Sequence, residues 1–216
     1  LGYLVPNYQI RQALYHKVST AENITIQANT LVEDVIQLED SAEVVLASGE
    51  HIETKLVIAA DSRFSSIRRK VGIPTLMKDF SKVMIVTKMM HEKSHENIAL
   101  ECFDYGKTLA LLPMIGNASS IVLTVKTNES QALLDMNEKE FNQFVTDAFK
   151  AELGVMTQAG ERHSYPLVAT HAQTFFAKRF ALIGDAAVGM HPVTAHGFNL
   201  GLRGQDILAN LIKEAL

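Results

Sequence analysis

The sequence predicts an α/β (α+β) fold in which a doubly wound parallel layer is interrupted by an inserted antiparallel sheet. Two apolar runs, LVIAAD at 56–61 and RFALIGD at 179–185, each end in an aspartate. Continuous apolar runs of this kind are typical of strands buried on both faces of a parallel sheet. Between them lie strand-like runs separated by turn residues, which is the pattern of an antiparallel meander.

These changes of pattern predict three segments along the chain. Residues 1–72 are expected to form the first part of the doubly wound domain, 73–165 the antiparallel insertion, and 166–216 the return to the first domain. The chain has no initiator Met, and its final helical pattern continues to the last residue. We therefore expect an internal piece of a longer protein.

The first segment begins with a helix and continues as a meander of strands. Ile10, Leu14 and Val18 recur at a spacing of four, which predicts a helix over 7–18 with Asn7 as its N-cap. Alternating and apolar patterns predict the remaining elements, which are strands at Ile24–Ile26, 31–39, 42–48, 51–55 and 56–61, and a helix at 65–72 that ends on Gly72.

Four runs of the second segment have the alternation of strands. They lie at 82–90, 97–104, 107–116 and 119–127. The clearest helix follows at 136–154, where Asn137 is the candidate N-cap and Glu140 completes a capping box. Its apolar stripe consists of Phe141, Phe144, Val145, Ala148 and Phe149. The third segment closes with a helix predicted over 197–212.

The composition is that of an ordinary globular protein and argues against several classes. Hydrophobic residues make up 47% of the 216 positions, and the net charge is −4, which does not favour a nucleic-acid partner. The one cysteine, Cys102, excludes an intrachain disulfide and favours a cytoplasmic location. No apolar run approaches the roughly 20 residues that a membrane-spanning helix needs.

The stretch GDAAVGMHPVTAHGFNLGLRG at 184–204 carries the strongest functional signal. Ligands of open α/β sheets bind outside the carboxyl ends of the strands, so Asp185 would project toward a ligand hydroxyl. Gly197 would allow close approach at the start of the last helix, where N–H groups and the positive dipole end favour an electron-rich atom. The residues alone leave a second interpretation open, in which Asp185 is a cap and the glycines, including Gly201 and Gly204, serve close helix packing only.

This stretch resembles the second flavin-binding motif of the class A FAD-dependent aromatic hydroxylases, the para-hydroxybenzoate hydroxylase-like family. The matching positions are Gly184, Asp185, Ala186, Ala187, Pro192, Gly197, Asn199 and Gly201, whereas Ala195 and His196 replace the usual Gly-Gln pair. Asp61, Ser65 and Arg68 are similar to the Asp-Gly motif of the same family. Two further stretches, LGYLVPNYQIRQAL at 1–14 and YPLVATHAQTFFAKRFALIGDAA at 165–187, resemble its ubiquinone-biosynthesis branch.

The resemblance implies a role for each matching residue. Asp185 would bind the ribityl hydroxyls of FAD, and Gly197, Phe198 and Asn199 would offer backbone near the pyrimidine edge of the flavin ring. Pro192 would line the ring on the side where oxygen reacts. The helix that starts near Asn199 would stabilise negative charge on reduced flavin. No catalytic base is implied.

Further positions match less closely. Asp61 would lie near the FAD diphosphate or the path of the reductant, but Ser62 replaces the usual glycine beside it. His196 replaces a glutamine, and its role stays open between a hydrogen bond to the flavin or quinol and a space-filling residue.

The basic run at 68–70 is interpreted as a solvated helix end. His91 and His95 fall in a predicted turn, so we expect no metal site.

The resemblance implies an incomplete FAD-binding doubly wound domain with an inserted substrate domain. It implies ring hydroxylation of a prenylated phenol or quinol in ubiquinone biosynthesis, through a flavin hydroperoxide formed with NAD(P)H and O2. The alternatives are another reaction of the same fold, such as prenyl reduction or epoxidation, and a non-catalytic scaffold of a quinone-synthesis complex. A complex of that kind and peripheral association with a membrane are further implications.

One expected motif is not in the sequence. The Gly-x-Gly-x-x-Gly dinucleotide fingerprint, which the family carries upstream, does not occur among the 216 residues. That motif holds the pyrophosphate of a dinucleotide at a helix N-terminus. We therefore expect these residues alone to bind FAD weakly or not at all.

Overall fold

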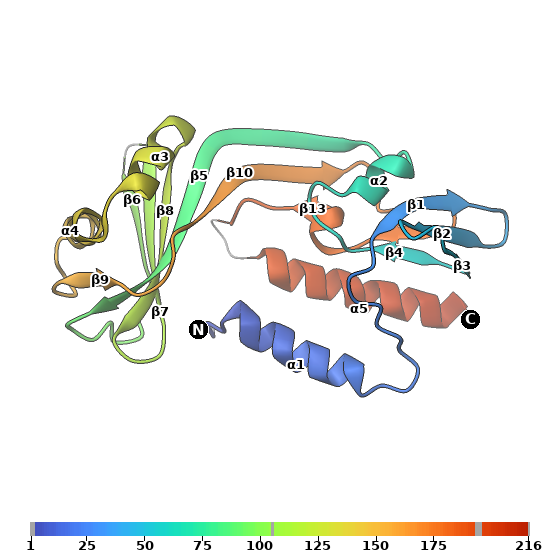
Figure 1. Ribbon diagram of the computed structural model, residues 1–216, viewed down its shortest axis with the longest axis horizontal. Helices are drawn as coiled ribbons and strands as arrows, with labels where there is room; N and C mark the ends of the chain where they lie inside the picture. The colour runs from blue at the N-terminus through green and yellow to red at the C-terminus, as the bar shows by residue number, and fades with distance from the viewer. Residues whose placement is uncertain (1–2, 105, 193–195, 216) are drawn as a thin grey trace. The chain divides into compact units, whose positions relative to one another are not determined.

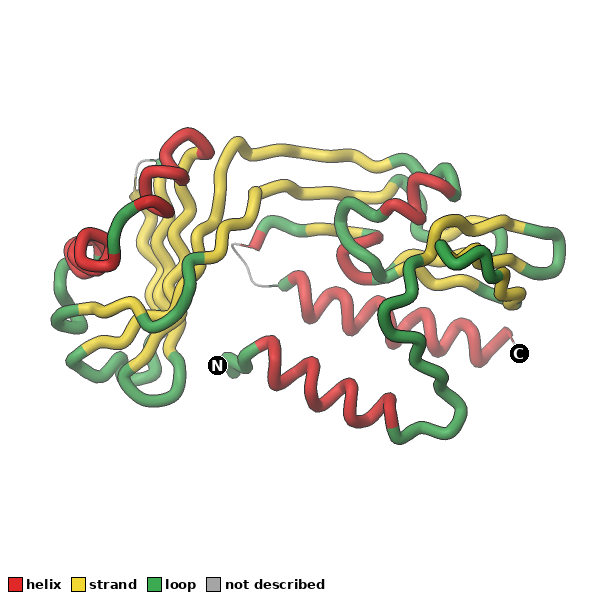
Figure 2. The backbone as a smooth tube through the Cα atoms, in the orientation of Figure 1, coloured by secondary structure: helices red, strands yellow, loops and turns green. Residues whose placement is uncertain are grey.

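The computed structural model contains short strands, several helices and one long curved strand (Figures 1 and 2). It describes residues 3–104, 106–192 and 196–215. Ala195, which belongs to the flavin-binding pattern of the sequence, lies outside the described residues.

The chain divides into two compact units. Unit 1 consists of Leu1–Thr25 and Ser81–Leu167, and unit 2 consists of Ile26–Phe80 and Val168–Leu216. Two strands, β5 (Thr75–His91) and β10 (His163–Ala172), contribute residues to both units. The boundaries differ from the predicted limits after residues 72 and 165, and residues 1–25 group with the insertion. The functional assignment of the three predicted segments stays a prediction.

Unit 1 is built on an antiparallel sheet, as the alternation of its strands predicts. The strand order is β5-β8-β7-β6, and β9 also pairs with β5. The bounds of these strands are β6 Leu100–Asp104, β7 Lys107–Pro113, β8 Ala118–Lys126 and β9 Met156–Gln158. Nine consecutive residue pairs join β5 to β8, from Lys82–Lys126 to Met90–Ala118, so this pair forms the centre of the unit.

Two helices of unit 1, α3 (Thr127–Asp135) and α4 (Glu138–Ala148), lie on one face of this sheet (Figure 1). The predicted capping box of α4 is confirmed: the backbone N–H of Glu140 donates to Asn137 Oδ1 at 3.0 Å, and the N–H of Asn137 donates to Glu140 Oε2 at 3.2 Å. The core between helices and sheet includes Ile85, Met89, Leu111, Ile121, Leu123, Phe141 and Val145. Helix α3 was not predicted.

The N-terminal helix α1 (Asn7–Ser19) occurs where the spacing predicts it, but two neighbouring expectations are wrong. Asn7 is the first helical residue, and Pro6, which has no capping side chain, stands at the N-cap. Ile24 and Ile26 lie in the loop before β1 rather than in a strand. Their alternation is only two apolar residues long, which is too short to compete with the loop conformation.

Unit 2 contains two three-stranded sheets and, in addition, the antiparallel pairing of residues 170–171 with 188–189. The predicted meander forms β1 (Val32–Gln37), β2 (Ala42–Leu46) and β3 (His51–Thr54), which pair antiparallel in that order. The second sheet has the order β11-β12-β4. Its strands and the remaining elements are β4 Val57–Ala59, α2 Ser66–Lys70, β11 Phe176–Ala177, β12 Phe180–Leu182, the 3-10 helix η1 Gly184–Ala186, β13 Val188–Gly189 and α5 Gly197–Ala215.

A separate apolar core holds unit 2 together. It gathers residues of β1, β4, α2, β10, β12, η1 and two connections, namely Val35, Ala59, Ile67, Ile73, Ala172, Phe180, Leu182, Ala186 and Ala187. The strands β4 and β12 run parallel, with Val57 opposite Phe180 and Ala59 opposite Leu182. The expectation that the two apolar runs ending in aspartate form parallel strands is therefore confirmed, although their sheet is mixed because β11 pairs antiparallel with β12. Burial on both faces holds for β12 but is wrong for β4, where Ile58 is 43% exposed.

Candidate functional site

The parallel pairing of β4 and β12 brings two aspartate-bearing loops to the same edge of a sheet. The ladder extends one residue past β12, where the N–H of Ile183 donates to the carbonyl of Ala59 at 3.1 Å. Asp61 follows β4 and Asp185 follows β12. Because ligands of open α/β sheets bind beyond the carboxyl ends of parallel strands, this edge is the candidate site.

Asp185 lies in the short helix η1 directly after β12. Gly184 makes the turn possible because its φ of +57° is in the left-handed region that glycine adopts readily. The Asp185 carboxylate is 44% exposed and forms an ion pair with Arg63, whose Nη2 and Nε donate to Oδ2 at 2.7 and 3.1 Å. Sequence reasoning missed Arg63, since no local pattern links positions 122 residues apart.

Arg68 connects the same two loops from inside the unit. Its side chain is only 2% exposed, and Nη1 donates to the carbonyl of Ala186 at 2.6 Å while Nη2 donates to that of Arg63 at 3.1 Å. Burial lowers the pKa of Arg68, and the nearby carboxylate of Asp61 partly opposes this effect. The interpretation of residues 68–70 as a solvated helix end is thus wrong for Arg68, although Arg69 and Lys70 are exposed.

Two serines shape the loop that carries Asp61. Ser65 is fully buried and caps α2, since its Oγ accepts the backbone N–H of Arg68 at 3.0 Å. Ser62, which replaces the glycine of the related motif, does not have a positive φ. Its Oγ instead accepts the N–H of Phe64 at 3.2 Å. The serine is therefore compatible with this loop, and Asp61 itself is exposed to solvent.

Helix α5 begins at Gly197, which is the first residue of the helix predicted over 197–212. Phe198 is 53% exposed, and Asn199 and Pro192 are also exposed. A Cβ placed on Gly197 would meet no atom within 4 Å among the described residues, so there is open space beside the helix start. Helix α5 also contacts η1, which brings its unpaired N–H groups and positive dipole end toward the segment that carries Asp185.

An apolar groove of about 400 Å³ runs between α5 and the strands β11 and β12. Its walls include Phe176, Leu182 and Leu211. The interpretation that the helix glycines allow close packing agrees with the surroundings of Gly201, because a Cβ there would lie 3.7 Å from Gly184 Cα. For Gly204 it stays a prediction, because a Cβ there would meet no described atom within 4 Å. Both glycines border the groove, and Gly201 is the one whose Cβ position lies against the η1 turn.

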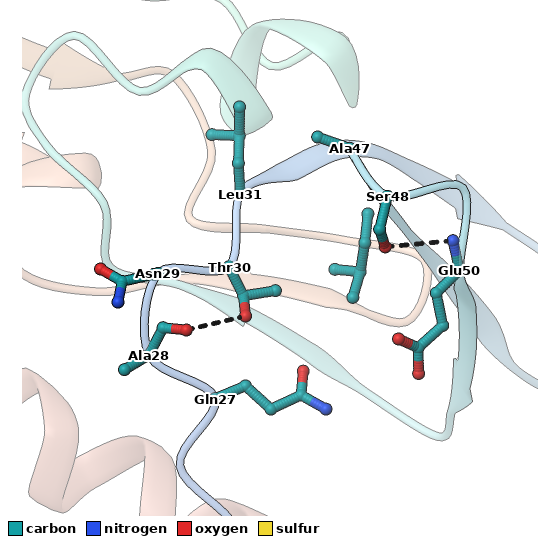
Figure 3. Close-up of a pocket in the computed structure, with 9 residues that line it drawn as sticks. Gln27, Ala28, Asn29, Thr30, Leu31, Ala47, Ser48 and Glu50 are labelled. Atoms are coloured by element: carbon teal, nitrogen blue, oxygen red, sulfur yellow. Dashed lines mark hydrogen bonds between the residues drawn. The ribbon is translucent and has the colours of Figure 1, made fainter.

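A second hollow of unit 2, of about 430 Å³, lies between the loop at residues 27–31 and the turn that joins β2 to β3 (Figure 3). Two local hydrogen bonds shape it, from Thr30 Oγ1 to the carbonyl of Ala28 and from the N–H of Glu50 to Ser48 Oγ. Its lining includes none of the predicted site residues and one charged side chain, that of Glu50. It offers no converging set of functional groups.

His91 is the last residue of β5 rather than part of a turn, whereas His95 lies in the connection to β6, and both are bonded to protein groups. His91 Nε2 lies 3.0 Å from Ser119 Oγ, and His95 Nε2 lies 2.9 Å from the carbonyl of Met114. Among the described residues, no group of three or more His, Cys, Asp or Glu side chains has the arrangement of a metal site. The same part of the chain contains no helix that is both long enough and apolar enough to cross a membrane.

Comparison with known proteins relates this arrangement to flavoproteins. The chain is 46% identical over 215 residues to a ubiquinone hydroxylase, UbiM, of Neisseria meningitidis, and 34% identical over 215 residues to a ubiquinone hydroxylase, UbiL, of Rhodospirillum rubrum. These alignments cover 100% of the chain but 47% and 50% of the relatives. The chain thus spans about half the length of the curated relatives it matches.

The fold is similar to that of PqsL from Pseudomonas aeruginosa, solved in complex with 2-aminobenzoylacetate. The TM-score is 0.82 at 20% identity, over 98% of this chain and 60% of PqsL. At this identity the likeness concerns the fold alone. The model of one family, described as the FAD binding domain, matches residues 3–216. That match includes both aspartate loops and α5, and the chain therefore belongs to the FAD binding domain family.

Proposed function

We propose that the gene-encoded protein containing this chain is an FAD-dependent monooxygenase. It hydroxylates the aromatic ring of a prenylated phenol or quinol in the biosynthesis of ubiquinone. The observation that carries the proposal is the parallel pairing of β4 and β12, because it places Asp61 and Asp185 at the same end of two neighbouring strands. Helix α5 contacts η1 in the same unit, and the chain belongs to the FAD binding domain family. The names of its relatives support the choice of reaction.

The residues present fit the ribityl and ring portion of FAD. Asp185 has one carboxylate oxygen, Oδ2, bound to Arg63, and no donor among the described residues reaches Oδ1. A carboxylate oxygen of this kind accepts hydrogen bonds from hydroxyl groups. The open space beside Gly197 would admit the edge of a flat ring close to the backbone.

Bound FAD would supply the electron transfer and the activation of oxygen, and the protein would supply binding and orientation. Asp185 would hold the ribityl hydroxyls, and the backbone at Gly197, Phe198 and Asn199 would face the pyrimidine edge of the ring. The N-terminus of α5 would stabilise negative charge there. Pro192 would cover the ring where oxygen reacts, and Asp61 would border the diphosphate or the path of the reductant.

The proposal also names the other participants. NAD(P)H is the reductant, and the substrate is an apolar aromatic molecule carrying a prenyl chain. A substrate of this kind dissolves in membranes, so the proposal includes a cytoplasmic protein with peripheral membrane contact and a place in a quinone-biosynthesis complex. The single cysteine, Cys102, supports a reducing compartment.

The test is expression of the gene-encoded protein and measurement of its flavin spectrum, NAD(P)H consumption and product mass. We expect a yellow protein that consumes NAD(P)H in the presence of a prenylated phenol and adds one oxygen atom to the ring. A protein that stays colourless with added FAD overturns every flavin-dependent function. Product that is reduced at the prenyl chain, or epoxidised there, overturns ring hydroxylation in favour of the other reactions of the fold.

A pair of variants tests the assignment of Asp185. Asp185→Ala removes a hydrogen-bond acceptor that carries charge, and bonds of that class contribute about 1.5–3 kcal/mol, so we expect FAD affinity to fall at least about tenfold. Asp206→Ala is the matched control, because Asp206 is an exposed aspartate of α5 that lies outside the candidate site. Equal FAD affinity in the two variants, measured by flavin fluorescence, would refute this assignment.

A further inference from the structure

Arg63 makes an asymmetric contact with the Asp185 carboxylate. Both Nε and Nη2 donate to the same oxygen, Oδ2, at 3.1 and 2.7 Å. The remaining terminal nitrogen, Nη1, donates to the carbonyl of Val168 in β10 at 2.9 Å. The guanidinium plane is therefore anchored at two points, and the other carboxylate oxygen of Asp185 receives no donor from the described residues.

The Cβ end of the Arg63 side chain is also closely packed. A Cβ on Gly189 of β13 would lie 2.8 Å from Arg63 Cβ and 2.7 Å from Thr170 Oγ1, so β13 can pass this close only with glycine at position 189. The N–H of Gly189 also donates to Thr170 Oγ1 at 3.2 Å, which keeps β13 against β10 at this point. The guanidinium group consequently has little freedom to leave Asp185.

We propose that Arg63 is a positioning residue for flavin binding, which fixes the Asp185 carboxylate through Oδ2 so that Oδ1 remains available to a ribityl hydroxyl. This inference rests on the proposed function, because it takes Asp185 as the ribityl ligand. An unrestrained aspartate side chain would lose rotational freedom when the ligand binds, whereas one that is already fixed loses less. The ion pair is only partly shielded, with 29% of the Arg63 side chain exposed, so its effect lies in orientation rather than in the strength of the pair.

The test is a double-mutant cycle on flavin affinity in the gene-encoded protein, with Arg63→Ala, Asp185→Ala and the double variant. Each is titrated with FAD and with riboflavin, which lacks the phosphates. We expect Arg63→Ala to weaken both ligands by a similar factor of about five to ten, the range of one hydrogen-bond contribution. In the Asp185→Ala background, the same substitution should change affinity less than about twofold, which is the coupling expected of residues that act as one unit. Arg69→Ala, which removes an exposed arginine of α2, is the matched control for loss of charge.

Three outcomes would overturn the proposal. Equal losses from Arg63→Ala with and without Asp185 would show that Arg63 acts independently of the carboxylate. Weaker FAD binding with unchanged riboflavin binding would show that Arg63 contacts the phosphates directly. Absence of flavin binding by the wild-type protein would overturn the proposed function together with this inference, so the two failures are distinguishable.

A second variant addresses the same arrangement without removing the guanidinium. Gly189→Ala introduces a methyl group within 3 Å of Arg63 Cβ and Thr170 Oγ1, so these groups or β13 must shift, and we expect the contact of Arg63 with Asp185 to be disturbed. We expect flavin affinity to fall as in Arg63→Ala, with no further loss when both substitutions are combined. Circular dichroism of the variant verifies that unit 2 is still folded. A folded Gly189→Ala protein with wild-type flavin affinity would contradict the role of Arg63.

Discussion

Helices α4 and α5 carry similar apolar stripes in very different surroundings. In unit 1, α4 buries Phe141 and Val145 completely in the core under the antiparallel sheet. In unit 2, none of the described residues of α5 is buried, and Ile207 and Leu211 are 54% and 57% exposed along the apolar groove. An amphipathic pattern therefore predicts that a helix forms, but its burial depends on what the rest of the chain places against it.

The two units also differ in what connects their segments. Unit 1 relies on interlocking apolar side chains such as Ile85 and Leu123, which are fully buried. The candidate site of unit 2 depends in addition on two arginines, since Arg63 and Arg68 tie the loop after β4 to the turn after β12. The hydrophobic effect that stabilises an apolar core is non-directional, whereas hydrogen bonds depend on geometry. The hydrogen bonds of these arginines therefore also fix the positions of the two loops.

The largest expected effect is on the core of unit 1. Phe141→Ala leaves a cavity in a fully buried site, and we expect the free energy of unfolding to fall by about 3–5 kcal/mol. The same substitution on α5, Phe198→Ala, should change it by only about 0.5 kcal/mol because that ring is 53% exposed. Urea titration followed by circular dichroism measures both. Equal destabilisation by the two substitutions would mean that α5 is as well packed as α4.

A smaller effect is expected where polar contacts join the loops of unit 2. Arg68→Ala removes the hydrogen bonds that Nη1 and Nη2 donate, and it leaves the buried carbonyl of Ala186 without its partner. We expect a loss of about 1–3 kcal/mol, the usual cost of an unsatisfied buried group. Arg69→Ala, one position along the same helix but exposed, is the matched control and should be nearly neutral. If Arg68→Ala proves as neutral as its control, the apolar core alone holds the two loops together.

The sequence was sufficient for features that depend on neighbouring residues. The capping box at Asn137 and the two apolar strands ending in aspartate involve contacts within a few positions or a clear local pattern. The same holds for the alternating strands of the inserted sheet. For the candidate site, the pattern at 184–204 predicted Asp185 and the start of α5 as its centre, an assignment that remains a prediction.

The missed features depend on residues far apart in the chain. The Arg63–Asp185 ion pair joins positions 122 residues apart, and the buried Arg68 donates to the carbonyl of Ala186, 118 positions along the chain. Helix α3 has a weak apolar pattern in which only Ser130 and Leu133 are buried, so its formation depends on packing against the sheet. The packing role predicted for Gly204 has no partner among the described residues, whereas Gly201 lies against Gly184 of the η1 turn.

The smallest effect concerns Gly204. The sign of the change in stability on replacing it shows whether this glycine serves close packing of α5 or only lowers its helix propensity. A Cβ at this position meets no described atom within 4 Å, so Gly204→Ala should stabilise α5 by about 0.5–1 kcal/mol through the higher helix propensity of alanine. Gly184→Ala should have the opposite sign, since the φ of +57° at that turn disfavours any side chain. Thermal unfolding of the two variants against the wild type measures the difference. A destabilised Gly204→Ala protein would indicate that a surface packs closely on this face of α5. The difference in burial between α4 and α5 would then depend on what covers each helix rather than on the sequences of the two helices.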